Sequence, residues 1–165
     1  MNHVTQIPFP PESQLHPLLA AAYYHDAFSA EMADPALSPV EMMVRFGAAF
    51  PDWGEALMSI RNAVVKWLGI RDVGAFRKAE PGPPRPPAVG GRLGIFNILA
   101  MDETELVLGI DDSHLDVRIS VLKRGARYVL GSVVTTHNWL GRLYMLPVGP
   151  LHRLIVRSTM RRAGV

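Results

Sequence analysis

The feature that most constrains the fold is a succession of strand-like segments in the second half of the sequence, joined by very short connections. The segments are LGIFNILAM (93–101), ELVLGI (105–110), HLDVRISVL (114–122) and RYVLGSVVTTH (127–137). The connections DET, DDS and KRGA are of the length that joins antiparallel neighbours. We therefore expect a meander of antiparallel strands in this region.

The first half predicts a strand followed by two helices. YYHDAFSAEM (23–32) alternates loosely, and Asp26 shares one side of the expected strand with Phe28, Ala30 and Met32. The next stretch, SPVE (38–41), has the residues of a helix N-cap, a proline at the first helical position and a capping box, so a helix should run to about residue 50. DWGE (52–55) repeats this signal, and apolar residues spaced by three and four predict a second helix to residue 69.

The remaining segments predict loops, a further strand and a last helix. Residues 1–22 are expected to form an extended entry segment, and the Pro/Gly-rich stretch 80–91 an exposed loop. The stretch HNWLGR (137–142) is typical of a turn between strands. Residues 140–146 are a candidate for one more strand. A last helix is expected over 150–163. Its expected apolar side and basic stripe are formed, respectively, by Leu151, Leu154, Ile155 and Ser158, and by Arg153, Arg157 and Arg161.

This order of elements predicts an α+β fold in a single domain over residues 1–165. A sheet with one covered face must bury that face against another element, and the last helix is the natural cover. A curved antiparallel sheet wrapped around a C-terminal helix resembles the helix-grip fold of START-related lipid-transfer proteins, polyketide cyclases and plant pathogenesis-related proteins. In that fold a cavity lies between the sheet and the final helix.

Composition excludes several classes of function. The sequence contains no Cys, so thiol nucleophiles and thiolate metal sites are ruled out. We also expect a cytoplasmic protein, because we find neither a signal-peptide pattern nor an apolar run long enough to span a bilayer. No GxSxG, phosphate-loop or nucleic-acid-binding module is visible, so we expect no nucleic-acid partner. Nine cations and no carboxylate follow Asp116, which favours an anionic ligand or partner for that half, or a solvated basic face.

One polar row is the main candidate for function. In HLDVRISV, residues His114, Asp116 and Arg118 alternate with apolar residues, so they share one face of a strand. Two orientations remain open. The row faces solvent, or it lines a cavity, which the neighbouring strand allows because it is apolar on both faces.

If the row lines the cavity, further polar residues are candidates to join it there. They are expected from the segment after the last strand: His137, Arg142, Tyr144 and His152. An Asp beside a His fixes its tautomer, so His114 or His152 with Asp116 is a candidate general acid/base pair.

A metal site is the second alternative. The two-His, one-carboxylate donor set of iron(II) oxygenases would be matched by His114 and Asp116, which share one strand face, together with a distant His137 or His152. Arg153 or Arg157 would then take the place of the arginine that holds the co-substrate in such enzymes. The number of expected strands is too small for their double-stranded β-helix, so we predict no metal and no cofactor.

Several motifs resemble a bacterial family known as domain of unknown function 2867. The matching blocks are DAFSAEM (26–32), PDWGEALMSIRNAVVKWLGI (51–70), GRLGIFNIL (91–99), ELVLGIDDSHLDVRISV (105–121) and HNWLGRLYMLPVGPLHRLIVRSTMRRA (137–163). In that family the domain occurs alone or fused behind a dehydrogenase-like domain. The resemblance implies no activity.

The sequence therefore favours a protein that binds a small, partly apolar molecule between the sheet and the final helix. It leaves open whether that molecule is anionic and whether the protein uses acid/base catalysis. The alternative is a non-catalytic interaction module that forms a homodimer or acts with a dehydrogenase-like partner. A sizeable cavity would favour the first, and an exposed apolar patch the second.

Overall fold

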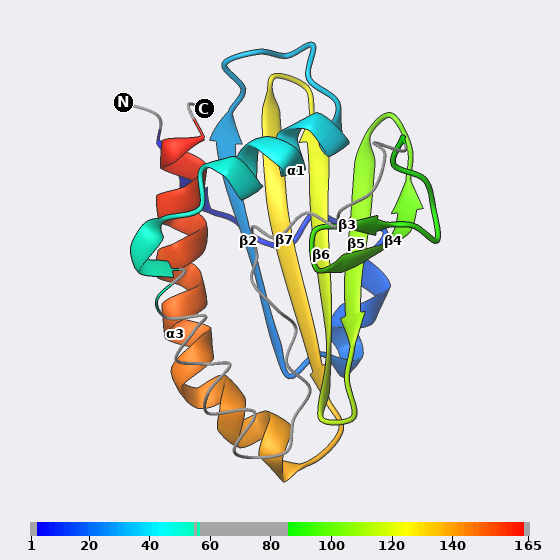
Figure 1. Cartoon of the computed structure of the whole chain (residues 1–165), viewed down its shortest axis with the longest axis vertical. Coiled ribbons are helices and arrows are strands. Elements are labelled where there is room, and N and C mark those ends of the chain that lie inside the picture. The colour runs from blue at the N-terminus through cyan, green and yellow to red at the C-terminus, as the bar shows by residue number, and fades with distance from the viewer. Residues whose placement is uncertain (1–2, 55, 57–85, 164–165) are drawn as a thin grey trace.

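A seven-stranded antiparallel sheet forms the centre of the molecule (Figure 1). The computed structural model describes residues 3–54, 56 and 86–163. The strands are β1 (Thr5–Gln6), β2 (Tyr24–Glu31), β3 (Arg92–Leu93), β4 (Phe96–Met101), β5 (Glu105–Asp111), β6 (Leu115–Arg124) and β7 (Arg127–Thr136). Their order in the sheet is β1-β2-β7-β6-β5-β4-β3. The expected meander and the expected first strand are both confirmed.

Strand β4 differs from the single strand expected over 93–101. Gly94 adopts a φ of 61°, a left-handed conformation that glycine reaches without steric cost. A hairpin turn therefore separates β3 from β4, with Leu93 paired to Phe96. The sequence pattern concealed this turn because apolar residues continue through it.

Helix α1 (Pro39–Ala48) begins as the sequence predicts. The Ser38 side chain accepts a hydrogen bond from the backbone of Glu41, and the Glu41 side chain accepts one from the backbone of Ser38. Met42, Met43 and Phe46 are buried on one side of the helix, which packs over β5 and β6. The second helix, expected over 52–69, lies almost entirely outside the described residues; positions 52–54 and 56 are helical.

Helix α3 (Trp139–Arg162) corrects three expectations. Residues 140–146 are helical rather than a strand, 137–142 contains the helix start rather than a turn between strands, and the last helix begins eleven residues before position 150. Asn138 is the N-cap, because its side-chain oxygen accepts a hydrogen bond from the Gly141 backbone at 3.0 Å. Pro147 and Pro150 lie inside the helix on its exposed side. The sequence pattern mistook them for a helix boundary, whereas α3 bends at its middle and continues (Figure 1).

The buried face of α3 is rotated from the expected one. Leu154, expected to be buried, is 59% exposed, whereas Val156, Thr159 and Met160 are buried. Arg153, Arg157 and Arg161 are exposed as expected. Two of these arginines also cover aromatic rings of β2: Arg153 lies over Tyr24 and Arg157 over Phe28, at 5.6 and 5.4 Å from the ring centroids.

The two faces of the sheet are covered by different parts of the chain. Helices α1 and α3 lie on the concave face, where Phe28, Leu108 and Val121 contribute to the main core. The N-terminal segment, which we define as residues 7–21 and which contains the 3-10 helix η1 (His16–Ala21), lies on the convex face. Its Phe9 approaches Gly131 so closely that a Cβ there would lie 2.8 Å from the ring. Leu15 packs with Val107 and Val133 on this face.

The α+β class, the curved antiparallel sheet and the C-terminal helix thus agree with the expected helix-grip type of architecture. Within the part of the chain that the structure describes, no helix combines the length and apolar character needed to cross a bilayer.

Candidate ligand-binding site

Two polar residues lie side by side on the concave face of the sheet. Asp26 of β2 and Ser132 of β7 are direct cross-strand partners, and both are only 2% exposed. Strand alternation places Asp26 on the same side as the buried Phe28 and Ala30. An ionisable group is therefore built into an otherwise apolar row.

His152 of α3 lies over this pair. Its Nε2 atom is 3.0 Å from Ser132 Oγ and 3.7 Å from Asp26 Oδ1. Both contacts are made by the same ring nitrogen. The other nitrogen, Nδ1, has no hydrogen-bond partner among the residues that the structure describes.

Tyr24 and Arg153 complete what we call the polar cluster: Tyr24, Asp26, Ser132, His152 and Arg153. The Tyr24 hydroxyl donates to Asp26 Oδ2 at 2.5 Å, and Arg153 Nε donates to the Tyr24 oxygen at 3.2 Å. Burial and the hydrogen bond to Asp26 raise the pKa of Tyr24 well above its usual range. The phenol therefore remains a hydrogen-bond donor to Asp26 throughout the physiological pH range.

Asp26 is buried with only one of its oxygens satisfied. Its side chain is 0% exposed, and Oδ1 has no hydrogen-bond partner in the described structure. Buried polar groups are paired in the great majority of proteins, so an unpaired carboxylate oxygen needs a specific explanation. Here the unpaired oxygen faces His152.

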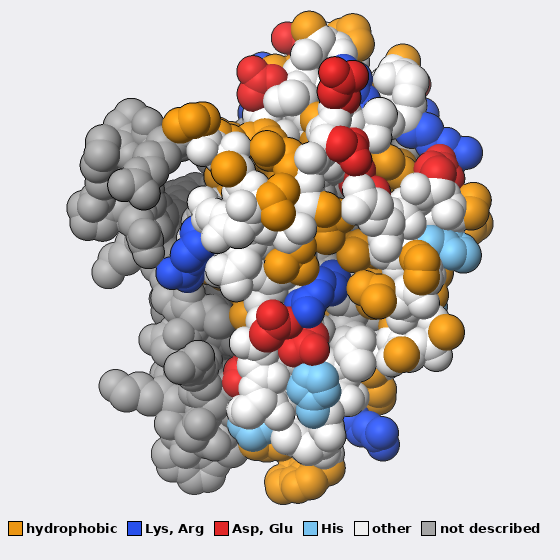
Figure 2. Space-filling view, turned by 90° about the vertical axis from the view of Figure 1, so that its right-hand side faces the viewer, with side chains coloured by type: hydrophobic (Ala, Val, Ile, Leu, Met, Phe, Trp, Pro, Cys, Tyr) orange, Lys and Arg blue, Asp and Glu red, His pale blue; other side chains and the backbone are white. Residues whose placement is uncertain are grey.

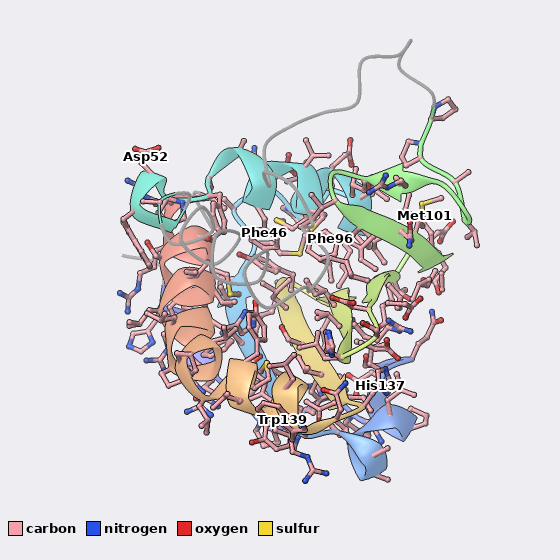
Figure 3. The ribbon with its side chains drawn as sticks, turned by 60° about the horizontal axis from the view of Figure 1, so that its bottom comes forward. Phe46, Asp52, Phe96, Met101, His137 and Trp139 are labelled. Atoms are coloured by element: carbon pink, nitrogen blue, oxygen red, sulfur yellow. The ribbon has the colours of Figure 1, made fainter. Side chains whose placement is uncertain are left out.

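A pocket of about 260 Å³ adjoins the cluster between the sheet, α1 and α3. Most of the described residues that line it are apolar; Phe46 of α1 and Phe96 of β4 both extend into the space between α1 and the sheet (Figure 3). The lining residues with polar side-chain atoms are Tyr24, Asp112, Ser132, Tyr144, His152 and Thr159. A few polar groups in an apolar hollow are typical of small-molecule sites.

Thr159 supplies a second unpaired polar atom. Its Oγ1 is buried and has no hydrogen-bond partner in the described structure. It lies seven residues after His152 on α3, which is two helical turns or about 10 Å along the axis. Buried polar atoms without a partner therefore lie beside the pocket at two levels of α3: Asp26 Oδ1 on β2, opposite His152, and Thr159 Oγ1 on the helix itself.

Two of the residues predicted from sequence line this pocket, Tyr144 and His152. The polar row does not, because β6 turns Leu115, Val117 and Ile119 toward the pocket and His114, Asp116 and Arg118 toward the opposite face. Of the two orientations left open by the sequence, the one with the row in the cavity is wrong. Arg142 is exposed on α3.

The polar row and its neighbours make their own contacts. Asp116 pairs with His137 at 3.1 Å, Arg118 pairs with Asp111 at 2.5 Å, and His114 Nδ1 accepts from the Asn138 amide at 2.8 Å. Figure 2, which views the molecule from the β4 edge of the sheet, shows acidic, basic and histidine side chains adjoining one another. These contacts join the ends of strands and the start of α3, which is a structural role.

The described residues do not assemble the expected metal ligands. No group of three or more His, Asp or Glu side chains converges as a possible metal site among them. His152 lies on the concave face and Asp116 on the convex face, so the sheet separates two members of the expected donor set.

Sequence analysis missed Tyr24, Asp26 and Ser132 as site residues. A signal for Asp26 was nevertheless present, because it shares a strand side with Phe28 and Ala30. A carboxylate on the apolar side of a strand is costly to bury and marks a position to examine. Ser132 gave no such signal, since only the strand register brings it to Asp26. His152 was predicted as a site residue, but with Asp116 rather than Asp26 as its carboxylate partner.

The fold and site define an α+β protein whose C-terminal helix carries a histidine to a buried carboxylate on the sheet. The family model described as "Protein of unknown function (DUF2867)" matches residues 18–159, so the chain belongs to this family. Searches of curated proteins and of solved structures each found no match.

Proposed function

We propose that this protein binds a small, mainly apolar molecule in the pocket between the sheet and α3, oriented by the polar cluster. The observation that carries the proposal is the unpaired Asp26 Oδ1 beside His152, at the border of an apolar hollow. Asp26 itself lies behind the lining, so a ligand with a hydrogen-bond donor would bind the lining residue His152, which Asp26 orients, and apolar contacts would supply most of the binding free energy.

The size and charge of the pocket restrict the ligand. A cavity of 150 Å³ accommodates benzene, so 260 Å³ corresponds to a ligand of about ten non-hydrogen atoms. The described lining contains Asp112 but no Lys or Arg, and Asp26 lies just behind it. A neutral ligand therefore fits better than the anionic ligand that the basic second half suggested.

Binding of 2-naphthol and naphthalene tests this proposal. Both are bicyclic and apolar, but only 2-naphthol carries a hydroxyl donor. We expect 2-naphthol to bind with a Kd about fivefold lower, because one hydrogen bond contributes about 1 kcal/mol. The measurement is a fluorescence titration of each compound with the purified protein.

A matched pair of variants assigns the binding to the pocket. Ile155 lines the pocket and Leu154, its neighbour on α3, is exposed. Ile155→Trp should fill the pocket and abolish binding of both compounds, whereas Leu154→Trp should leave both affinities unchanged. Equal affinities of the wild-type protein for the two compounds, or unchanged binding by Ile155→Trp, would contradict the proposal.

One observation favours the interaction module as a second candidate. Trp139, Leu143 and Leu146 are 73%, 50% and 64% exposed, and their spacing of four and three places them on one side of α3. Native mass spectrometry of the purified chain tests this candidate. A dimer that Leu143→Glu converts to monomer supports self-association through this side, whereas a monomeric wild-type chain carrying a small organic molecule supports the pocket.

A further inference from the structure

We propose that His152 is a general base that removes a proton from a carbon acid bound in the pocket, and that Asp26 is its positioning residue. The substrate class is a mainly apolar carbonyl compound with a C–H bond next to the carbonyl group. This inference rests on the proposed ligand-binding function and adds a reaction to it. Protons on oxygen or nitrogen exchange with water unaided, whereas carbon-bound protons exchange slowly, so a base held beside a C–H bond accelerates their transfer measurably.

The contacts of His152 favour one tautomer. Asp26 Oδ1 and Ser132 Oγ both face Nε2, and Asp26 Oδ1 can only accept hydrogen bonds when it is ionised. A proton on Nε2 is therefore attracted by both groups, whereas a lone pair there would face a carboxylate oxygen. The proton belongs on Nε2, which leaves the lone pair of Nδ1 available to accept a proton from a ligand.

The cluster is better satisfied after proton transfer than before it. A general base starts with a neutral ring, and in the described structure Asp26 Oδ1 lacks a hydrogen bond. Once Nδ1 gains a proton, the ring becomes an imidazolium, and its Nε2–H can pair with Oδ1 after closing from 3.7 Å by about 1 Å. Interactions that strengthen as charge develops lower the barrier rather than only binding the ground state.

Tyr24 and Arg153 hold Asp26 in place for this role. The Tyr24 hydroxyl occupies Asp26 Oδ2, so Oδ1 is the oxygen left to face His152. Arg153 in turn fixes the Tyr24 oxygen from the surface of α3. These two residues position the carboxylate and do not contact the reacting atoms.

The proton transfer balances without a co-reactant. The C–H bond breaks, its electron pair forms the enolate of the substrate, and the proton goes to His152 Nδ1. His152 then returns the proton to another carbon of the same molecule, which gives an isomer. If the proton on Nδ1 first exchanges with water, return of a solvent proton to the original carbon gives exchange with solvent. Nucleophilic attack by Ser132 is disfavoured, because a serine–histidine–aspartate relay needs Ser and Asp on different ring nitrogens and here both lie at Nε2.

Hydrogen–deuterium exchange of 2-indanone tests the inference. This bicyclic ketone has ten non-hydrogen atoms and acidic C–H bonds beside its carbonyl. We expect the wild-type chain to accelerate loss of deuterium from the labelled ketone at least about tenfold over His152→Gln. The control Arg161→Gln, at an exposed position on the same helix, should exchange at the wild-type rate.

A positioning role for Asp26 has its own readouts. Asp26→Asn should slow exchange at least about tenfold while 2-naphthol still binds, and Tyr24→Phe, which keeps the carboxylate, should retain part of the rate. Long-range ¹H–¹⁵N spectra should show the Nε2–H tautomer of His152 in the wild type and a loss of this preference in Asp26→Asn. Tyr24→Phe and the wild-type spectrum still test the idea if Asp26→Asn does not fold.

The outcomes separate this inference from the proposed function. Failure of the wild-type chain to bind 2-naphthol would overturn the ligand-binding proposal and this inference with it. Normal 2-naphthol binding with equal exchange rates in wild type and His152→Gln, or an Nδ1–H tautomer in the wild type, would overturn the general base alone.

Discussion

At the scale of single residues, two buried carboxylates differ in how completely they are satisfied. Glu105, on the convex face, is 2% exposed and accepts hydrogen bonds from the Ser13 hydroxyl at 2.6 Å, the Gln14 backbone at 2.9 Å and the Ser120 hydroxyl. Asp26, on the concave face, accepts one hydrogen bond and leaves one oxygen unpaired. Glu105 therefore attaches the N-terminal segment to the sheet, whereas Asp26 has one oxygen that can still accept a hydrogen bond.

Replacement of the Glu105 carboxylate tests its structural role. Glu105→Gln should lower the free energy of unfolding by about 2 kcal/mol, because the amide oxygen replaces only one carboxylate oxygen and the NH2 group cannot accept the hydrogen bond made to the other. Urea denaturation measures the change. Glu103→Gln, two positions away at an exposed site, should unfold like the wild type. A loss of the same size in both variants would contradict the assignment.

The burial of Tyr128 should make the free energy of unfolding depend on pH in the alkaline range. Its ring is 1% exposed, its hydroxyl has no hydrogen-bond partner in the described structure, and burial raises its pKa above the usual value near 10. Above pH 10 the unfolded chain loses this proton while the folded chain keeps it. The folded state therefore loses up to about 1.4 kcal/mol per pH unit through this residue.

Tyr128→Phe removes this dependence. Between pH 10 and 11 its free energy of unfolding should fall less steeply than that of the wild type, by up to about 1.4 kcal/mol per unit. At pH 7 the variant should be as stable as the wild type or more stable by about 1 kcal/mol, because an unpaired buried hydroxyl is removed. Urea titrations at several pH values check both points, and parallel pH profiles would refute the first.

At the scale of the elements, helix starts were predictable where side chains cap them locally. Ser38, Pro39 and Glu41 identify the start of α1 directly. The start of α3 was missed because Asn138 has no acidic partner three residues later, and because Pro147 and Pro150 indicate a boundary that the fold overrides. Helix α3 tolerates these prolines because they lie on its solvent side, where the helix bends.

The close approach of α3 to β6 gives a prediction for Gly141. A Cβ at this position would overlap the carbonyl oxygen of His114, which is backbone and cannot rotate away. Gly141→Ala should therefore lower the free energy of unfolding by at least about 2 kcal/mol despite the higher helix propensity of Ala. Arg142→Ala, the next position and exposed, should cost less than about 0.5 kcal/mol. Thermal and urea unfolding measure both, and equal stabilities would be inconsistent with the contact.

At the scale of the whole molecule, the sequence predicted the layers and two residues of the pocket, Tyr144 and His152, but not the carboxylate that His152 faces. Alternation and short turns predict an antiparallel sheet without any tertiary information. The orientation of the polar row is a tertiary property, because it depends on which face of β6 the helices cover. The meeting of Asp26, Ser132 and His152 depends on the pairing of β2 with β7 and on the course of α3, and local sequence patterns carry neither.

The convex face depends on its cover. The N-terminal segment buries Val107 and Val133 through Leu15. Deletion of residues 1–15 should expose this apolar surface and remove two donors to Glu105, so the shortened chain should self-associate and unfold at lower urea concentration. Size-exclusion chromatography with light scattering compares it with a control lacking residues 1–3. A shortened chain with the size and denaturation midpoint of the full chain would show that the segment is dispensable.

The pairing of β2 with β7 also has a consequence for synthesis on the ribosome. Glu31 and Arg127, at one end of this strand pair, are 96 positions apart in the chain. At 5–20 residues per second, β2 leaves the ribosome roughly 5 to 20 s before the strand that pairs with it. Throughout that interval Phe28 and Ala30, which are 0% exposed in the finished fold, have no sheet to join. The nascent chain therefore carries an unpaired apolar strand, which is the kind of segment that chaperones bind during translation.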